Sequence, residues 1–342
     1  MSKQNRTTML AILLGVVVGA ILAITVFWAI FKDWGTSKPV EDQSNLNLQG
    51  GKPFRVVLPA IYHPVHKLML AGFMDACRDN KLYCEPMTMG DVTLDEYIQK
   101  VEYAASLGSS AVIMNLGAPV LYKPGQDLVA ASGNVVAVHT PISKTDIPGL
   151  TAWISADPAV YARAAAKEMA DKLACTGKVA VMQSGQSDTE NLVGNTFGTE
   201  LKQLCPNITV LETQMEGVEP TKAAAVDAAV LAAHADLAGA FSTTGGGPTS
   251  WATALKEAGR KPGDVVVISM DYTLPNLALV KEGWVYALVG QPIYEEFYAA
   301  VELALARLKK EPVTYENPLP APIIKADTVD KYIAINSNAG NK

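Results

Sequence analysis

Residues 54–76, FRVVLPAIYHPVHKLMLAGFMDA, decide the fold of this chain. They open with an apolar run rich in β-branched residues, break at Pro59, and pass through a polar and aromatic bend. Apolar residues then recur at helical spacing. A buried parallel strand followed directly by a helix places the bend at the carboxyl end of the strand, where open α/β sheets bind ligands. Tyr62, His63 and His66 are therefore predicted to form one side of a binding site.

Short β-branched runs alternate with amphipathic stretches through the rest of the body. The pattern predicts strands at residues 54–58, 82–87, 111–114, 135–138, 178–182, 208–211, 239–241, 265–269 and 286–289, and helices at residues 94–107, 159–173, 191–204, 222–233, 249–258, 275–281 and 293–309. This alternation is typical of an α/β fold with parallel sheets. A length of 342 residues suits two domains and an appendage.

The appendage is the N-terminal segment. Residues 9–31, MLAILLGVVVGAILAITVFWAIF, carry no charge and are long enough to cross a bilayer as a helix. Lys3 and Arg6 precede this run, so the positive-inside tendency places residues 1–8 in the cytoplasm and sends the body outward. The run is therefore predicted to be one transmembrane anchor.

A cleaved secretory signal is the alternative for the same run. Its apolar part is longer than a usual signal core, and no small-x-small site follows before Phe31. In either case the body is exported to the periplasm or cell exterior. Residues 32–52 are polar and are predicted to be a flexible linker, because such a composition cannot bury enough apolar surface to fold.

Several motifs of the body occur in a recognisable order. They are the bend with His63 and Gly72, the 135–138 strand that ends at His139, residues 153–157 before a long helix, Phe197, the stretch VVVISMD that ends in Asp271, and GQPIYEE around Gln291. In their order and spacing, residues 53–335 resemble the type I periplasmic solute-binding proteins. These form the ribose- and galactose-binding group of the ABC transporter substrate-binding family.

The resemblance implies two Rossmann-like lobes with parallel sheets, joined by a three-segment hinge. The N-lobe is expected to comprise residues 53–155 plus 292–322, and the C-lobe residues 156–291 plus 323–342. The crossings would fall near residues 155, 291–292 and 321–322. Such a body works by hinge closure over a small molecule.

Asp271 and Gln291 are the strongest candidates for ligand contacts. Asp271 ends an apolar strand, so its carboxylate could accept charge-assisted hydrogen bonds from two adjacent hydroxyl groups. The alternative is a capping role at the next helix, near Thr273. Gln291 offers a donor and an acceptor at the second crossing, and its alternative role is a hydrogen bond within the hinge.

His139, Thr140 and Asn191 lie at further positions where the resemblance implies ligand contacts. Sugar-binding relatives often place an acid and an arginine at the first two positions and another arginine near the third, and this sequence has none of these. Recognition of the ribose type is therefore less supported, and a less densely hydroxylated or differently charged ligand is favoured. A polyol or modified sugar is expected, because Asp271 and Gln291 remain.

Aromatic and glycine-rich segments supply the remaining candidates. Tyr62, Trp153, Tyr272 and Tyr294 could each stack on a sugar ring or pack in the core. Thr244, at the start of a Thr-Gly-Gly-Gly-Pro turn, is predicted to reach the ligand. The histidines could bind a metal, but neither a cysteine nor a tight His-x-His spacing accompanies them, so no metal and no cofactor are expected.

The cysteines fall into two local pairs, Cys77 with Cys84 and Cys175 with Cys205. An even number of cysteines in an exported protein favours disulfides. Two bridges are therefore predicted, with buried free thiols as the alternative.

Enzymatic and nucleic-acid functions find little support. The sequence has no G-x-S-x-G elbow, no Walker loop and no G-x-G-x-x-G after the first strand, and its formal net charge is −6. The predicted function is therefore a monomeric solute-binding component that captures a sugar or polyol and docks on an ABC permease. The alternatives are a membrane-tethered sensor that presents its ligand-bound state to a receptor or kinase and, with weaker support, a hydrolase or isomerase that uses the histidines.

Overall fold

The fold is described from a computed structural model, which describes residues 51–63, 65–91, 93–184, 188–217 and 219–338. The predicted anchor at residues 9–31 and most of the predicted linker lie outside these ranges. Within the described ranges, no helix combines the length and the apolar character that crossing a membrane requires.

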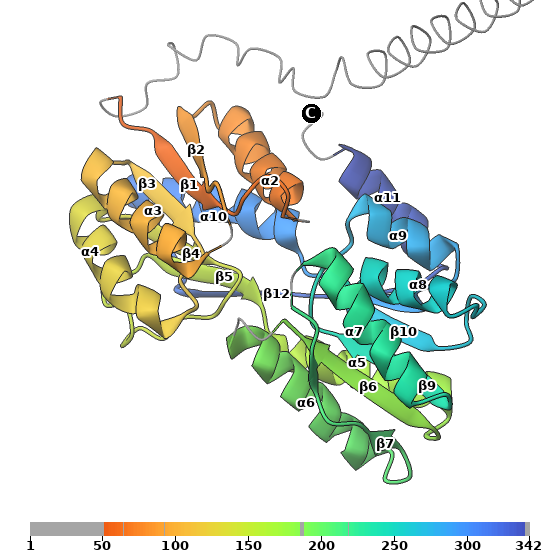
Figure 1. Cartoon of the computed structure of the whole chain (residues 1–342). Helices are drawn as coiled ribbons and strands as arrows, with labels where there is room; N and C mark the ends of the chain where they lie inside the picture. Colours follow the sequence, from red (N-terminus) through yellow and green to blue (C-terminus); the bar gives the residue numbers. More distant parts are fainter. Residues whose placement is uncertain (1–50, 64, 92, 185–187, 218, 339–342) are drawn as a thin grey trace, which may run out of the picture. The chain divides into compact units, whose positions relative to one another are not determined.

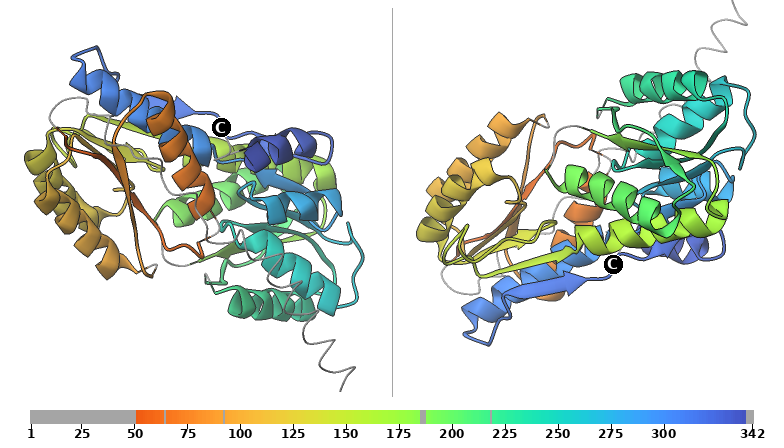
Figure 2. Two further views of the ribbon diagram at one scale, coloured as in Figure 1. Left: turned by 90° about the horizontal axis from the view of Figure 1, so that it is seen from above. Right: turned by 90° about the horizontal axis from the view of Figure 1, so that it is seen from below.

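The first sheet has the strand order β12-β5-β4-β3-β1-β2, and its neighbouring strands run parallel to one another. Helices α2 and α10 cover one face, and α3 and α4 cover the other (Figures 1 and 2). The bounds are β1 (Phe54–Leu58), β2 (Cys84–Thr88), β3 (Ala111–Met114), β4 (Val135–Val138), β5 (Ala152–Ala156), β12 (Glu316–Leu319), α2 (His66–Asp79), α3 (Leu94–Leu107), α4 (Tyr122–Ser132) and α10 (Ile293–Leu308), with a short 3₁₀ helix at Pro119–Leu121.

The second sheet has the order β13-β11-β10-β9-β6-β7, with β8 pairing to β6. Its pairings are parallel except for β13 with β11. Helices α5 and α6 pack on one face, and α7, α8, α9 and α11 pack on the other side (Figure 1). The bounds are β6 (Lys178–Gln183), β7 (Thr209–Val210), β8 (Gln214–Met215), β9 (Leu237–Ser242), β10 (Val266–Met270), β11 (Ala287–Val289), β13 (Ile323–Ile324), α5 (Pro158–Leu173), α6 (Asp188–Leu204), α7 (Pro220–Ala233), α8 (Gly247–Glu257), α9 (Leu274–Lys281) and α11 (Val329–Asn338).

Strand composition explains why each sheet is covered on both faces. Successive side chains of a strand point to opposite faces, so Val56 and Leu58 pack with α2 and α10 while Val57 packs with α3 and α4. Every residue of β1 is buried. Continuous apolar runs such as this one are what parallel strands between two helical layers require.

Both sheets repeat one topology. The orders β2-β1-β3-β4-β5 and β7-β6-β9-β10-β11 are the same when the strands are counted from the first strand of each sheet. In this doubly wound order the strand sequence changes direction next to the first strand, between β1 and β3 and between β6 and β9. Ligands of open α/β sheets bind outside the carboxyl ends of the strands at such a switch point.

Some elements were absent from the expected set. The sequence singled out residues 153–157, which overlap β5, as a motif but did not predict a strand there. Strands β12 and β13 and helices α4 and α11 were not predicted either. Strand β12 lies at the edge of its sheet and contains Pro318, which breaks the apolar pattern of a strand and is tolerated at an edge. Helix α4 carries Pro124 and Gly125 near its start, which hides its helical periodicity.

Both predicted disulfides are present. Cys77 near the end of α2 is bonded to Cys84 at the start of β2, and Cys175 after α5 is bonded to Cys205 after α6. The first bridge therefore ties α2 to the strand that follows it. The second ties together the ends of α5 and α6, which pack on the same face of the second sheet.

Candidate ligand-binding site

Polar side chains collect at the carboxyl ends of strands in both sheets. His63 follows β1 and His139 follows β4 in the first sheet. Gln183 ends β6, Thr243 follows β9 and Asp271 follows β10 in the second. The segments after β1, β6 and β9 flank the two switch points, where a doubly wound sheet binds its ligand.

Several of these side chains have polar atoms that lack a hydrogen-bond partner. Among the residues that the structure describes, the buried atoms His63 Nδ1, Gln183 Nε2, Thr243 Oγ1 and Asp271 Oδ1 have none. An unsatisfied buried polar group costs about 1–3 kcal/mol. A ligand that supplies partners to these atoms would offset that cost, which makes this edge the best candidate for a binding site.

The backbone is strained where two of the candidate residues lie. His139 has a φ of 70° and Asp271 a φ of 66°, a region that residues other than glycine adopt rarely. Each occurs directly after the last residue of a strand, and such conformations concentrate at functional sites. Gly245 approaches Asp271 so closely that a Cβ built on it would lie 2.2 Å from Asp271 Oδ2. The glycine of this turn is therefore needed to seat the carboxylate.

Asp271 is a buried carboxylate, with 7% of its surface exposed. The pKa of this group is raised to about 6, chiefly by burial; the charges of Glu296 and Glu190 also act to raise it, while His139 acts to lower it. Thr273, not Asp271, caps α9, because its side chain accepts a hydrogen bond from the backbone N–H of Asn276. The carboxylate of Asp271 is thus available to a ligand.

His139 forms an ion pair with Glu296, which the sequence reasoning missed. The distance from His139 Nδ1 to Glu296 Oε2 is 3.3 Å, and Glu296 Oε1 accepts a hydrogen bond from the backbone N–H of Ala156. Burial lowers the pKa of His139, but the carboxylates of Glu296, Asp271 and Glu190 together raise it above its ordinary value. The signal in the sequence was the second glutamate of GQPIYEE, at the first turn of α10.

His63 and His66 of the N-terminal bend have different surroundings. The pKa of His63 is lowered to about 4, chiefly by burial and to a smaller extent by the charges of His139 and His66. His66 is buried, and its Nδ1 lies 2.8 Å from the carbonyl oxygen of Pro59. Within the described residues, no group of three or more His, Cys, Asp or Glu side chains is arranged to hold a metal ion.

Gln291 and Thr244 are both buried near this edge and hydrogen-bonded. Gln291 Nε2 donates to the hydroxyl of Tyr161 over 3.1 Å, and burial raises the pKa of that hydroxyl. Thr244 Oγ1 donates to Glu216 Oε1 over 2.8 Å. The Thr244 hydroxyl also accepts a hydrogen bond from the backbone N–H of Gly247 over 3.0 Å, so it is held within its turn, whereas the side-chain oxygen of Gln291 could accept from a ligand.

Behind Thr244 lies a pair of buried carboxyl groups. Burial raises the pKa of both Glu216 and Asp227, and the charge of Glu216 raises that of Asp227 further. Ser242 donates a hydrogen bond to Glu216. Glu216 thereby holds the side chain of Thr244 in place.

The remaining predicted contacts have other surroundings. The Tyr62 ring is 67% exposed and its hydroxyl donates to Asp91. Trp153 packs in the cluster between the first sheet and helices α3 and α4. Asn191 lies in the first turn of α6 and is half-buried. Thr140 packs against Gly117.

Two other aromatic candidates have structural partners. The hydroxyl of Tyr272 donates to Glu295 over 3.0 Å and its ring packs edge-on against Tyr332. The hydroxyl of Tyr294 donates to Asp75 over 2.9 Å. Trp153, Tyr272 and Tyr294 therefore belong to the packed framework, which was the alternative for each of them.

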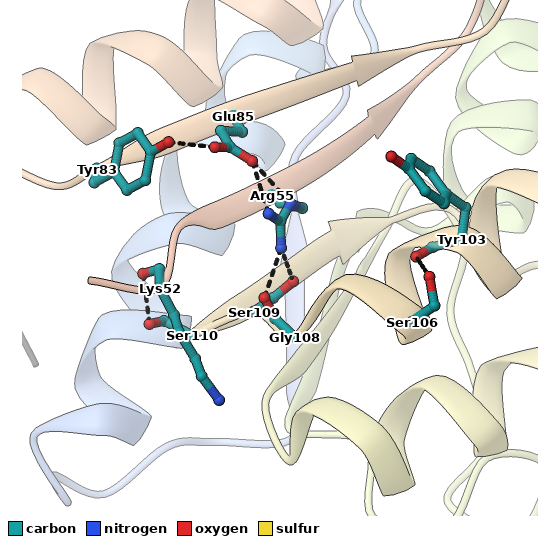
Figure 3. Close-up of polar contacts among 9 residues, drawn as sticks. All are labelled: Lys52, Arg55, Tyr83, Glu85, Tyr103, Ser106, Gly108, Ser109 and Ser110. Carbon is teal, nitrogen blue, oxygen red and sulfur yellow. Dashed lines mark hydrogen bonds and ion pairs between the residues drawn. The ribbon is translucent and has the colours of Figure 1, made fainter. Parts of the chain in front are cut away.

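The amino edge of the first sheet contrasts with the carboxyl edge because its charges are paired. Arg55 donates to Glu85 at 2.7 and 3.0 Å, to the carbonyl oxygen of Gly108 and to Ser109 (Figure 3). The hydroxyl of Ser110 donates to the carbonyl oxygen of Lys52 nearby. This cluster ties the first strands together and leaves little for a ligand to satisfy.

A cavity of about 470 Å³ also lies at this amino edge, lined by residues that include Ser110, Asn134, Arg307 and Lys310. The side chain of Asn134 already donates to the carbonyl oxygens of Ser110 and Ala304. The unpartnered buried atoms described above are at the other edge. The carboxyl edges are therefore a stronger candidate for the ligand site than this cavity.

The chain is similar in sequence and fold to known proteins. Residues 54–312 match the family model described as "Periplasmic binding protein domain". An ABC transporter solute-binding protein from Agrobacterium vitis with bound D-fucose is 23% identical, with a TM-score of 0.76 over 83% of this chain and 99% of that one. The glucose-galactose binding protein GanP from Geobacillus stearothermophilus is 17% identical, with a TM-score of 0.74 over 82% and 99% of the two chains.

A third similar structure is an ABC transporter periplasmic solute-binding protein from Actinobacillus succinogenes with bound D-allose, 17% identical, with a TM-score of 0.74 over 82% of this chain and all of that one. At these identities the structures show the shared fold. The family match covers most of the chain, so the chain belongs to the periplasmic binding protein family of the type I fold.

Proposed function

We propose that this protein captures a small polar ligand, a sugar, polyol or related compound, outside the cytoplasm and delivers it to an ABC importer. The proposal is supported by family membership and by the ligands named for similar solved structures, D-fucose and D-allose. The observation that carries it is the set of unpartnered buried polar atoms at the carboxyl edges, with Asp271 Oδ1 foremost.

Two lobes would close around this ligand. The N-lobe comprises residues 53–155 plus 292–322 and the C-lobe residues 156–291 plus 323–342. Support comes from the sheets, because β12 pairs with β5 while β13, a few residues later, pairs with β11. His139 of the first sheet interacts electrostatically with Asp271 of the second, so closure brings ligand groups from both lobes together.

A binding screen tests the capture of a polar ligand. Thermal unfolding of the purified body would be followed with pentoses, hexoses, polyols and nucleosides. A ligand at 100 times its dissociation constant adds about 2.7 kcal/mol of stability, enough for a clear shift in Tm. Stabilisation by at least one polyhydroxylated compound is expected, and a flat response across the whole panel would contradict the proposal.

The membrane partner separates an importer from a sensor. The full chain, bearing an affinity tag, would be isolated with its ligand from detergent-solubilised membranes. Co-purification of a permease with its ATPase is expected. Recovery of a receptor or kinase instead would support the tethered-sensor alternative and overturn the transport assignment.

A further inference from the structure

We propose that the ligand of this site carries a positive charge, as a protonated amine does, in addition to its hydroxyl groups. The inference rests on the proposed function, because it names the ligand class of the same site. The argument starts from the charges around Asp271.

The charged groups that act on the Asp271 carboxylate are His139, Glu296 and Glu190. His139 and Glu296 are an ion pair at 3.3 Å, so their charges compensate each other when the imidazole is protonated. No lysine or arginine among residues 51–338, as far as the structure describes them, acts on Asp271. The short undescribed gaps within that span contain Pro, Val, Gly, Gln and Ser, so the sequence places no basic residue there.

A second observation is the hydrogen bonding of the carboxylate. Asp271 is only 7% exposed, and its Oδ1 is buried without a hydrogen-bond partner among the described residues. Buried charges in proteins are normally paired or hydrogen-bonded. Asp271 therefore has an acceptor atom and an uncompensated charge at the same place, and a ligand ammonium group satisfies both.

Two partly buried carboxylates elsewhere in the chain are compensated by basic side chains, whereas the buried carboxyl groups of Glu216 and Asp227 have raised pKa values instead. Glu85 is paired with Arg55 at 2.7 Å (Figure 3), and Glu168 accepts a hydrogen bond from Lys325 at 2.8 Å. Asp271 differs from both. A neutral sugar would give Asp271 hydrogen bonds but no compensating charge. An anionic ligand would be repelled by the carboxylates of Asp271, Glu190 and Glu296.

The first experiment compares matched ligands by isothermal titration calorimetry at pH 7.5. D-Glucosamine, D-galactosamine, D-mannosamine and 1-amino-1-deoxy-D-sorbitol would each be paired with the parent compound that carries a hydroxyl group in place of the amine. At least one amine is expected to bind at least tenfold more tightly than its parent, about 1.4 kcal/mol. Parents that bind as tightly as their amines would overturn the inference while leaving the proposed function in place. No binding of any compound in either set would count against the proposed function itself.

The second experiment uses Asp271→Asn, with Asp327→Asn as control. Asparagine adopts the left-handed conformation of residue 271 as readily as aspartate, and Asp327 is exposed. The variant is expected to lose at least tenfold more affinity for the preferred amine than for its parent, while the control changes neither. Retention of the amine preference by Asp271→Asn would contradict the inference. The wild-type comparison above decides the question even if this variant folds poorly.

Discussion

Asp271 gives a prediction that needs no knowledge of the ligand. The native pKa of this carboxyl, about 6, is above its ordinary value of 3.8 because the group is buried. Native protein therefore binds more protons than unfolded protein between about pH 4 and pH 6, and stability falls as the pH rises through that range. A rise from 3.8 to about 6 corresponds to about 3 kcal/mol at 1.36 kcal/mol per pKa unit.

The substitution Asp271→Asn removes this titration. The free energy of unfolding of the variant relative to wild type is expected to increase by up to about 3 kcal/mol between pH 4 and pH 7.5, in favour of the variant at the higher pH. Any constant effect of the amide cancels, because only the change with pH is used. Urea unfolding at both pH values measures it, with Asp327→Asn as the exposed control.

A pH-independent difference would refute this reasoning, since it would mean that burial does not perturb residue 271. A difference of opposite sign would mean that a cationic group compensates Asp271 in the free protein. A gain in stability accompanied by loss of ligand binding would instead place residue 271 among the sites where function is maintained at the expense of stability.

Two further predictions concern the framework and the ion pair. Gly72→Ala is expected to lower the free energy of unfolding by about 1–3 kcal/mol, because its Cβ would lie 2.3 Å from the carbonyl oxygen of Tyr294. Gly198→Ala, in α6 with 3.6 Å to its nearest neighbour, is expected to raise it by up to about 1 kcal/mol, and urea unfolding compares the two. Glu296→Gln is expected to lower the pKa of His139 below 6.5, because burial then acts with less opposition, and NMR titration of the imidazole would show it. An unchanged pKa would mean that Glu296 does not set the charge of His139.

The fold was predictable because its strands are buried on both faces. Runs such as VVISM in β10 are buried throughout and mostly apolar, and the polar residue that follows each run marks the edge of the sheet. The edge strand β12 escaped prediction for the opposite reason. Strand β12 alternates exposed and half-buried residues and contains a proline, so it resembles a loop.

The candidate site was predictable only in part. Asp271 and His139 follow strands directly, and His63 lies in the bend between β1 and α2, so their positions are evident from local sequence. Glu296 and Tyr161 reach this edge from helices, and only tertiary packing brings them there. Trp153 shows the converse, because an aromatic residue at a strand end can face either side of the sheet, and here it packs against α3 and α4.

The most direct test of the account is a crystal structure of the protein with the tightest ligand from the binding screens. The account predicts a ligand nitrogen or oxygen within hydrogen-bonding distance of Asp271 Oδ1, about 2.7–3.2 Å away, with His139 on the opposite side. A ligand bound in the cavity beside Arg307, with Asp271 Oδ1 still lacking a partner, would contradict it.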